Sequence, residues 1–345
     1  MKQPSPWTLA EIWNTALVRQ KPRSYEPRER IWASEHYGAD IDLYLKLNGV
    51  QPSNEPNKRS LRKFEAGNMH EWFIKLVLVA AGIYKSSQDR IEVQLEEKLL
   101  PVSGKIDFYA GGHPELHESL RNILGNMELP ELYQRQAEAL VQLFQEKYPN
   151  GLEEKILEIK SVAATVFDRI EQTGKAIPGH EVQAYHYAHG TGKRVTICYL
   201  CRDDLRMYEV DIMPNDPNLH KRYKDRVKAI SEAFRGGVEP SPEPLVVYDP
   251  DMGRFSKNFK VEYSSYLTRI YGFKEPREYS DRFAPMIKSW NYVLGRIAKN
   301  KNMTPKNMEA LKQIESFGFN LDEIKNNLSD LASKGVDTSE EETDE

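Results

Sequence analysis

Two carboxylates and a lysine lie in strand-like segments of this 345-residue chain, in an arrangement that could hold a divalent metal against a phosphate. Glu158 and Lys160 are two residues apart in an apolar stretch. In a strand their side chains share one face, while Leu157 and Ile159 point into the core. Asp107 lies in an earlier strand-like stretch. If the two strands are neighbours, Asp107 and Glu158 converge beside Lys160.

The chemistry that these residue types support is metal-assisted hydrolysis of a phosphodiester. Mg²⁺ prefers oxygen ligands and keeps several waters, so two carboxylates and one backbone carbonyl, expected to be that of Ile159, are sufficient. Such a metal polarises a phosphoryl oxygen and activates a water. Lys160 would then hold and help to deprotonate that water, or stabilise the charge that develops at phosphorus. Taken alone, however, Glu-x-Lys in an apolar strand is more typical of a surface ion pair.

Two helical segments carry further candidates. Gln183 and Tyr187 are four residues apart, so they share one helical face and could reach a phosphate or a metal-bound water. The alternative is an amphipathic helix that packs Tyr185 and Tyr187 in the core. Upstream, His70 could supply an imidazole ligand and Glu71 an alternative carboxylate. A lone helical histidine is more often structural.

In combination and in this order, the motifs resemble the RecB-type branch of the PD-(D/E)XK nuclease superfamily, which includes phage exonucleases and other recombination nucleases. That branch carries a helical G-x-x-H-like motif, an acid after a G-x-x-D strand, E-x-K, and Q-x-x-x-Y on a helix. The resemblance covers roughly residues 60 to 212. The matching positions here are His70, Asp107, Glu158, Lys160, Gln183 and Tyr187.

The resemblance implies an α/β fold of the restriction-endonuclease-like type, with a mixed central sheet flanked by helices and with helical N- and C-terminal additions. It also implies Mg²⁺- or Mn²⁺-dependent cleavage of DNA. Asp107 and Glu158 would ligate the metal, with His70 as a further ligand and Lys160 as a catalytic residue.

By the same resemblance, Gln183 and Tyr187 would support the substrate phosphate or the geometry of the site. The predicted activity is that of an exonuclease in DNA recombination, repair or replication. Two alternatives stay open: a catalytically silent DNA-binding or replication-scaffold module, and a structure- or sequence-specific endonuclease with the same site. Some relatives carry a four-cysteine iron–sulfur cluster, but the two cysteines here, Cys198 and Cys201, are too few for one.

Those two cysteines exclude a disulfide framework and favour a reducing compartment. They fall in a strand-like stretch, so we expect them to point to opposite faces and to pack in the core. The N-terminus lacks the apolar region of a signal peptide, and the longest apolar run, residues 76–83, is too short to span a bilayer. The expected location is therefore the cytoplasm, without a membrane role.

The formal net charge is −4, but six of the acids lie in the last ten residues. That acidic tail is expected to be solvated or to bind a protein partner. The rest of the chain is close to neutral, so a DNA surface must be a local basic patch. Candidates for phosphate contacts, with solvated helix faces as the alternative, are Lys58, Arg59, Arg62 and Lys63, and farther along Lys221, Arg222 and Lys224.

The expected organisation is a helical lead-in over 1–60, a nuclease core over 61–212, a helical region over 213–334 and an acidic disordered tail over 335–345. Fifty residues separate Asp107 from Glu158, which predicts a helical insertion over 113–150 within the core. Hydrophobic periodicity predicts helices over 61–83 and 177–189, and strands over 91–96, 102–109, 155–162, 194–200 and 206–212.

Overall fold

The computed structural model describes residues 25–116 and 131–334. Contacts divide the chain into two compact units, with the main division between Glu239 and Pro240, and with the short stretches 39–42 and 51–55 assigned to the second unit. The division does not fall at residue 212, because helix α8 (Pro217–Gly236) packs against helix α7 (Pro178–Thr191) in the first unit.

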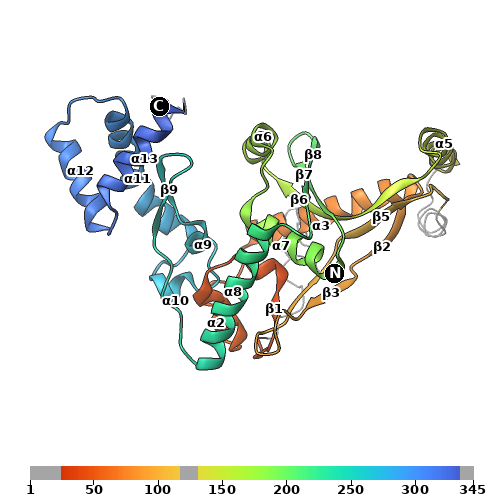
Figure 1. Cartoon of the computed structure of the whole chain (residues 1–345), viewed down its shortest axis with the longest axis horizontal. Coiled ribbons are helices and arrows are strands. Elements are labelled where there is room, and N and C mark those ends of the chain that lie inside the picture. Colours follow the sequence, from red (N-terminus) through yellow and green to blue (C-terminus); the bar gives the residue numbers. More distant parts are fainter. Residues whose placement is uncertain (1–24, 117–130, 335–345) are drawn as a thin grey trace, which may run out of the picture. The chain divides into compact units, whose positions relative to one another are not determined.

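The first unit is organised around a mixed sheet of five strands in the order β2-β5-β6-β7-β8 (Figure 1). The pairing of β6 with β7 is parallel, and the other three pairings are antiparallel. The predicted α/β fold with a mixed central sheet flanked by helices is confirmed. The strands are β2 (Tyr84–Ser87), β5 (Phe108–Gly112), β6 (Leu152–Val162), β7 (Val195–Cys201) and β8 (Met207–Ile212).

Helices cover both faces of this sheet. Helix α3 (Lys58–Ala80) buries Ile74 and Leu78 against one face. Helix α7 covers the other face, and together with α6 (Ala164–Thr173) it forms the crossover that makes β6 and β7 parallel. Proline at the first position of α7 and a left-handed glycine just after its last turn mark the two ends of that helix.

Alternation along the strands separates the two faces. In β6, Leu157 and Ile159 belong to the cluster under α3, whereas Ile156 and Val162 belong to the larger cluster under α7. The cysteines of β7 follow the same rule, since Cys198 packs on the α3 face and Cys201 on the α7 face. Both are buried and free, as expected for core packing.

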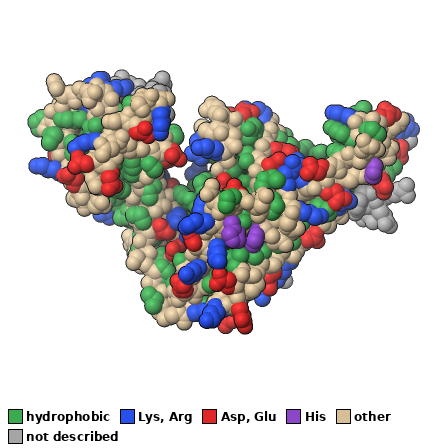
Figure 2. Space-filling view, viewed as in Figure 1, with side chains coloured by type: hydrophobic (Ala, Val, Ile, Leu, Met, Phe, Trp, Pro, Cys, Tyr) green, Lys and Arg blue, Asp and Glu red, His purple; other side chains and the backbone are tan. Residues whose placement is uncertain are grey.

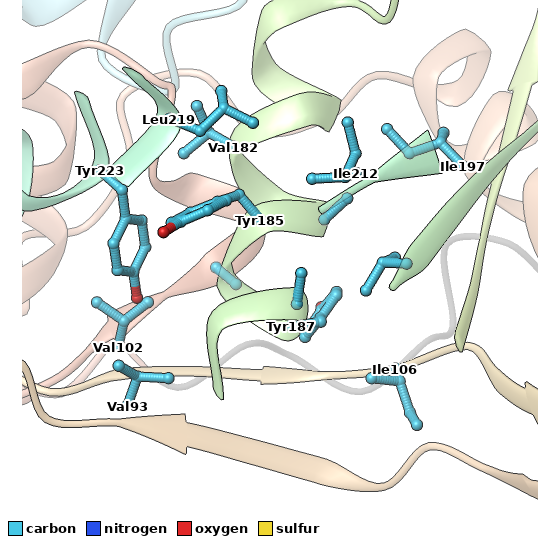
Figure 3. Close-up of a cluster of buried hydrophobic side chains, with 14 of the residues drawn as sticks. Val93, Val102, Ile106, Val182, Tyr185, Tyr187, Ile197, Ile212, Leu219 and Tyr223 are labelled. Atoms are coloured by element: carbon cyan, nitrogen blue, oxygen red, sulfur yellow. The ribbon is translucent and has the colours of Figure 1, made fainter. Parts of the chain in front are cut away.

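The larger cluster joins α7 and α8 to strands of both sheets of this unit (Figure 3). Tyr185 of α7 and Tyr223 of α8 lie edge to face, with ring centroids 5.7 Å apart. Tyr187 projects from the same helix and is 1% exposed. Other members are Val93, Val102, Ile106, Val182, Ile197, Ile212 and Leu219.

The single strand predicted over 102–109 is wrong. The chain forms β4 (Val102–Lys105), which pairs with β1 (Ile31–Trp32) and β3 (Arg90–Val93) in a separate sheet, and then β5 in the central sheet. Residues two apart in a continuous strand share a face, yet Ile106 packs under α7 and Phe108 under α3. The chain therefore changes sheet at Asp107.

The region between β5 and β6 contains α5 (Glu131–Lys147), whose Ala137 packs against Val79 of α3. Residues 117–130 of the predicted insertion lie outside the described residues, as do residues 1–24 and the acidic tail with its expected protein partner. In the rest of the lead-in, the elements are β1, a 3₁₀ turn at Ala33–Glu35 and helix α2 (Asp40–Leu47).

Within its described residues, the second unit is helical except for one hairpin. The Pro-rich segment near 240–250 contains strand β9, which pairs antiparallel with β10. Phe255 and Trp290 meet edge to face at the centre of this core, 5.0 Å apart. The elements are β9 (Val246–Asp249), β10 (Arg254–Lys257), α9 (Phe259–Glu262), α10 (Leu267–Tyr271), α11 (Pro276–Ala298), α12 (Pro305–Ser316) and α13 (Leu321–Ser333). None of the helices in the described part of the chain is long and apolar enough to cross a bilayer.

Candidate active site

Glu158 and Lys160 lie together on the α7 face of strand β6. The Lys160 ammonium donates hydrogen bonds to Glu158 Oε1 at 2.6 Å and to Gln183 Oε1 at 3.1 Å. Glu158 is only 1% exposed, so this ion pair is not the surface pair that an isolated Glu-x-Lys pattern favours. Solvent reaches this ion pair only at Lys160, whose side chain is 20% exposed.

Asp107 joins this pair because strands β5 and β6 are neighbours. Phe108 lies opposite Leu157 in the antiparallel register, which places Asp107 beside Glu158. Asp107 Oδ2 accepts a hydrogen bond from the backbone N–H of Ile159 at 2.7 Å. The insertion leaves the sheet at the far end of β5, so it does not separate the two acids.

Helix α7 brings the predicted amide and phenol to the same place. Gln183 Nε2 donates to the Tyr187 hydroxyl at 3.3 Å while its carbonyl oxygen accepts from Lys160. Tyr187 is therefore both a core residue and a neighbour of the acids. Burial and the charge of Glu158 raise the pKa of its phenol above the ordinary value. Tyr185 belongs to the core alone.

The helix α3 residues separate from one another. His70 Nδ1 is hydrogen-bonded to Ser161 Oγ at 2.9 Å, and burial and the Arg202 guanidinium lower the pKa of its imidazole. Glu71, the next residue along α3, lies in the electrostatic field of the acids: burial and the charge of Glu158 raise the pKa of its carboxyl. His70 is thus paired with a hydroxyl, whereas the charge of Glu71 is coupled to that of the carboxylates.

The charges in this site are out of balance. Burial and the neighbouring Glu158 and Glu71 raise the pKa of Asp107 to about 8. Burial lowers the pKa of Lys160, but the charges of Glu158 and Asp107 outweigh burial and hold that pKa above its usual value. Three carboxyl groups therefore share one ammonium, and the site favours an additional cation or proton.

One buried oxygen indicates where a cation would fit. Glu158 Oε2 is buried and has no hydrogen-bond partner, although its other oxygen is paired with Lys160. An unsatisfied buried carboxylate oxygen is costly unless a cation or donor meets it. Within the described ranges, however, no group of three or more His, Cys, Asp and Glu side chains is placed to hold a metal ion. The acids thus supply hard oxygen donors that fit Mg²⁺ or Mn²⁺, and waters or backbone carbonyls must complete the coordination.

The predicted basic patches differ in their surroundings. The three side chains on α8 are engaged in ion pairs, Lys221 with Asp225, Arg222 with Glu181 and Lys224 with Glu96. The four on α3 lie in its first two turns and are exposed; they are Lys58, Arg59, Arg62 and Lys63. Positive and negative side chains are interspersed over the face seen in Figure 2, so any DNA-binding surface there is local.

Two neighbours of the site were not singled out as functional residues from the sequence. Gly104 lies where a Cβ would come within 2.7 Å of the Tyr187 ring and 2.9 Å of Ala33 Cβ. Only glycine allows Tyr187 to approach strand β4 so closely. His180, one turn before Gln183, is partly buried, and burial and the Lys160 charge lower its pKa to about 3. The sequence shows this glycine in Gly-Lys-Ile-Asp, but not its contact with Tyr187, eighty-three positions away.

No family model matches the chain, and no curated protein matches it. Similar solved structures include SSO0001, at 10% identity and a TM-score of 0.39, covering 76% of this chain and 96% of that one. They also include an alkaline exonuclease, LHK-Exo from Laribacter hongkongensis, at 14% identity and a TM-score of 0.36, covering 66% of this chain and 94% of that one. The same exonuclease in complex with dAMP is similar at 15% identity and a TM-score of 0.39. These similarities are too distant to assign a function to the chain.

Proposed function

We propose that this chain is a metal-dependent DNA nuclease, and that it acts as an exonuclease. The observation that carries the proposal is the group of Asp107, Glu158 and Lys160, in which a buried carboxylate oxygen of Glu158 has no partner. Such an oxygen, beside the Asp107 carboxyl whose pKa is raised by burial and by the neighbouring acids, suits a divalent cation. A purely structural ion pair does not require three carboxyl groups beside one ammonium.

Asp107 and Glu158 would hold the metal. The further ligand near it would be the carboxylate of Glu71 rather than the imidazole of His70. The Ile159 carbonyl is a further ligand in this proposal. In an antiparallel strand, the N–H and C=O of one residue point to the same side. Because the Ile159 N–H meets Asp107, its carbonyl is directed to that side as well.

When bound, Mg²⁺ or Mn²⁺ would polarise the phosphate and lower the pKa of a water. Lys160 would orient that water or stabilise the charge at phosphorus, since its ammonium lies between Glu158 and Gln183. Gln183 fixes the position of the ammonium, and Tyr187 fixes the position of Gln183. In this proposal His70 would contact the substrate through its Nε2, since its Nδ1 is paired with Ser161 Oγ.

A catalytically silent DNA-binding module is the second candidate. The observation in its favour is that no three-ligand group of His, Cys, Asp and Glu is assembled in the described part of the chain. A DNA-binding module does not require the ion pair between Lys160 and Glu158, whereas a nuclease uses both residues. The nuclease is therefore the better-supported function.

The test is cleavage of end-labelled linear and covalently closed circular DNA, single- and double-stranded, with Mg²⁺, Mn²⁺ or EDTA. We expect metal-dependent degradation of linear DNA that is lost in Asp107→Ala and Lys160→Ala. Lys155→Ala is the matched control, since Lys155 is on the same strand but pairs with Glu209 at the surface. Attack on closed circles would indicate an endonuclease, and no cleavage under any condition would favour the silent module.

A further inference from the structure

The side of helix α3 that carries Glu71 also carries an exposed aromatic residue. Positions three, four and seven residues apart lie on one side of a helix, so Phe64, Gly67 and Glu71 are aligned. Farther along the same side, Ile74 and Leu78 are buried against the central sheet. Phe64, in the second turn of α3, is 54% exposed. An exposed apolar ring thus lies on the side of α3 that carries Glu71.

The helix surface between this ring and Glu71 is open at Gly67. A Cβ built at Gly67 would meet no heavy atom within 4 Å, in contrast to Gly104, where it would clash with Tyr187. Phe64 and Glu71 are seven residues apart, which is about 10 Å along a helix. A stacked nucleic-acid strand rises about 3.4 Å per nucleotide, so this span matches roughly three nucleotides.

The charge beside the ring suits a phosphate backbone. Lys63, the residue next to Phe64, is exposed and makes no ion pair among the described residues. Lys58 and Arg59 precede it in the same two turns. Basic side chains interleaved with an exposed aromatic ring are the elements of single-strand binding, in which bases stack and phosphates meet cations.

We propose that Phe64 stacks on an unpaired nucleobase of the strand whose phosphate lies at Asp107 and Glu158. The substrate class is then single-stranded DNA, or a duplex end whose strands have been parted. The position of the phosphate rests on the proposed nuclease function, but the stacking contact does not require cleavage. Met69, Trp72 and Phe73 are also exposed on α3, but Phe73 is nine residues from Phe64 and lies on the opposite side of the helix.

The experiment uses the full chain and single-stranded oligonucleotides that carry 2-aminopurine at successive positions, in EDTA so that no metal-dependent cleavage occurs. Wild type should quench the fluorescence at a few adjacent positions, and Phe64→Ala should abolish the quenching. Phe64→Trp should retain it and Phe64→Leu should not, since a base stacks on an aromatic face. Phe73→Ala is the matched control and should behave as wild type.

Kinetics with Mg²⁺ provide the second readout. Phe64→Ala should raise KM for single-stranded DNA by about tenfold, at the scale of one stacked base, with little change in kcat. Equal quenching by Phe64→Ala and Phe73→Ala, or wild-type behaviour of Phe64→Leu, would overturn the stacking proposal. So would a change of oligomeric state in Phe64→Ala without an effect on DNA. Quenching that depends on Phe64 in a chain that cleaves nothing would support stacking and overturn the nuclease instead.

Discussion

Replacing Asp107 with asparagine should stabilise the metal-free protein by an amount that grows with pH. Asp107 is 9% exposed, and burial and the nearby acids raise its pKa from 3.8 to about 8. The folded protein therefore holds a proton that the unfolded chain releases, so wild-type stability falls as pH rises from about 4 to about 8. Asparagine does not titrate, and its amide oxygen can still accept the hydrogen bond from Ile159.

The size of the effect follows from one proton. Its linkage contributes at most about 1.4 kcal/mol per pH unit, and this slope halves as the pH reaches the pKa of about 8, so the gain of Asp107→Asn over wild type should grow by up to about 2.3 kcal/mol between pH 6 and pH 8. For a folded unit of this size, that corresponds to roughly 5 to 10 °C in Tm. The upper value applies if Asp107 alone carries the proton, and sharing with Glu158 and Glu71 reduces the slope.

Scanning calorimetry in EDTA at several pH values measures this difference. Asp203→Asn is the matched control, because the Asp203 carboxylate also accepts a backbone N–H, that of Ala164 at 2.9 Å, but is exposed. Its difference from wild type should not change with pH. If the stability difference between Asp107→Asn and wild type were constant between pH 6 and pH 8, the conclusion that Asp107 is protonated in the folded protein would be refuted.

Three further outcomes follow from the same geometry. The apparent affinity for Mn²⁺ should rise with pH up to about 8, because the metal must displace the proton of Asp107; titrations across that range check this, and a flat profile would contradict it. In metal titrations Glu71→Gln should weaken binding by about tenfold or more, whereas His70→Gln should change it little, and the reverse order would restore His70 as the ligand. Gly104→Ala should cost about 1–3 kcal/mol in unfolding experiments and displace Tyr187, while Gly67→Ala, in open space, should not destabilise the protein.

The sequence predicted the central features of the site because they depend on local periodicity. Alternation along an apolar strand requires Glu158 and Lys160 to share a face, and four-residue spacing on a helix requires Gln183 and Tyr187 to do so. Both expectations agree with the hydrogen bonds observed. The pairing of β5 with β6 could be stated only as a condition, because strand order is a tertiary property.

What could not be predicted depends on contacts between distant residues. The chain changes sheet at Asp107, whose side chain accepts a hydrogen bond from the N–H of Ile159, fifty-two positions away. Whether His70 or Glu71 faces the acids depends on the rotation of α3 against the sheet, since adjacent helical residues point about 100° apart. Likewise, the basic residues on α8 could not be matched to partners as remote as Glu96, which pairs with Lys224.

The measurement that tests the central claim most directly is a Mn²⁺ titration of wild type and Glu158→Gln, followed by electron paramagnetic resonance of the free ion. Glutamine preserves the size of the side chain and removes the charge of the buried carboxylate whose Oε2 has no partner. The proposed site predicts a bound Mn²⁺ in wild type near pH 8 that is lost in Glu158→Gln and retained in Glu209→Gln, a change at an exposed acid on strand β8. Equal Mn²⁺ binding by all three proteins, or none in wild type, would contradict a metal centre at Asp107 and Glu158.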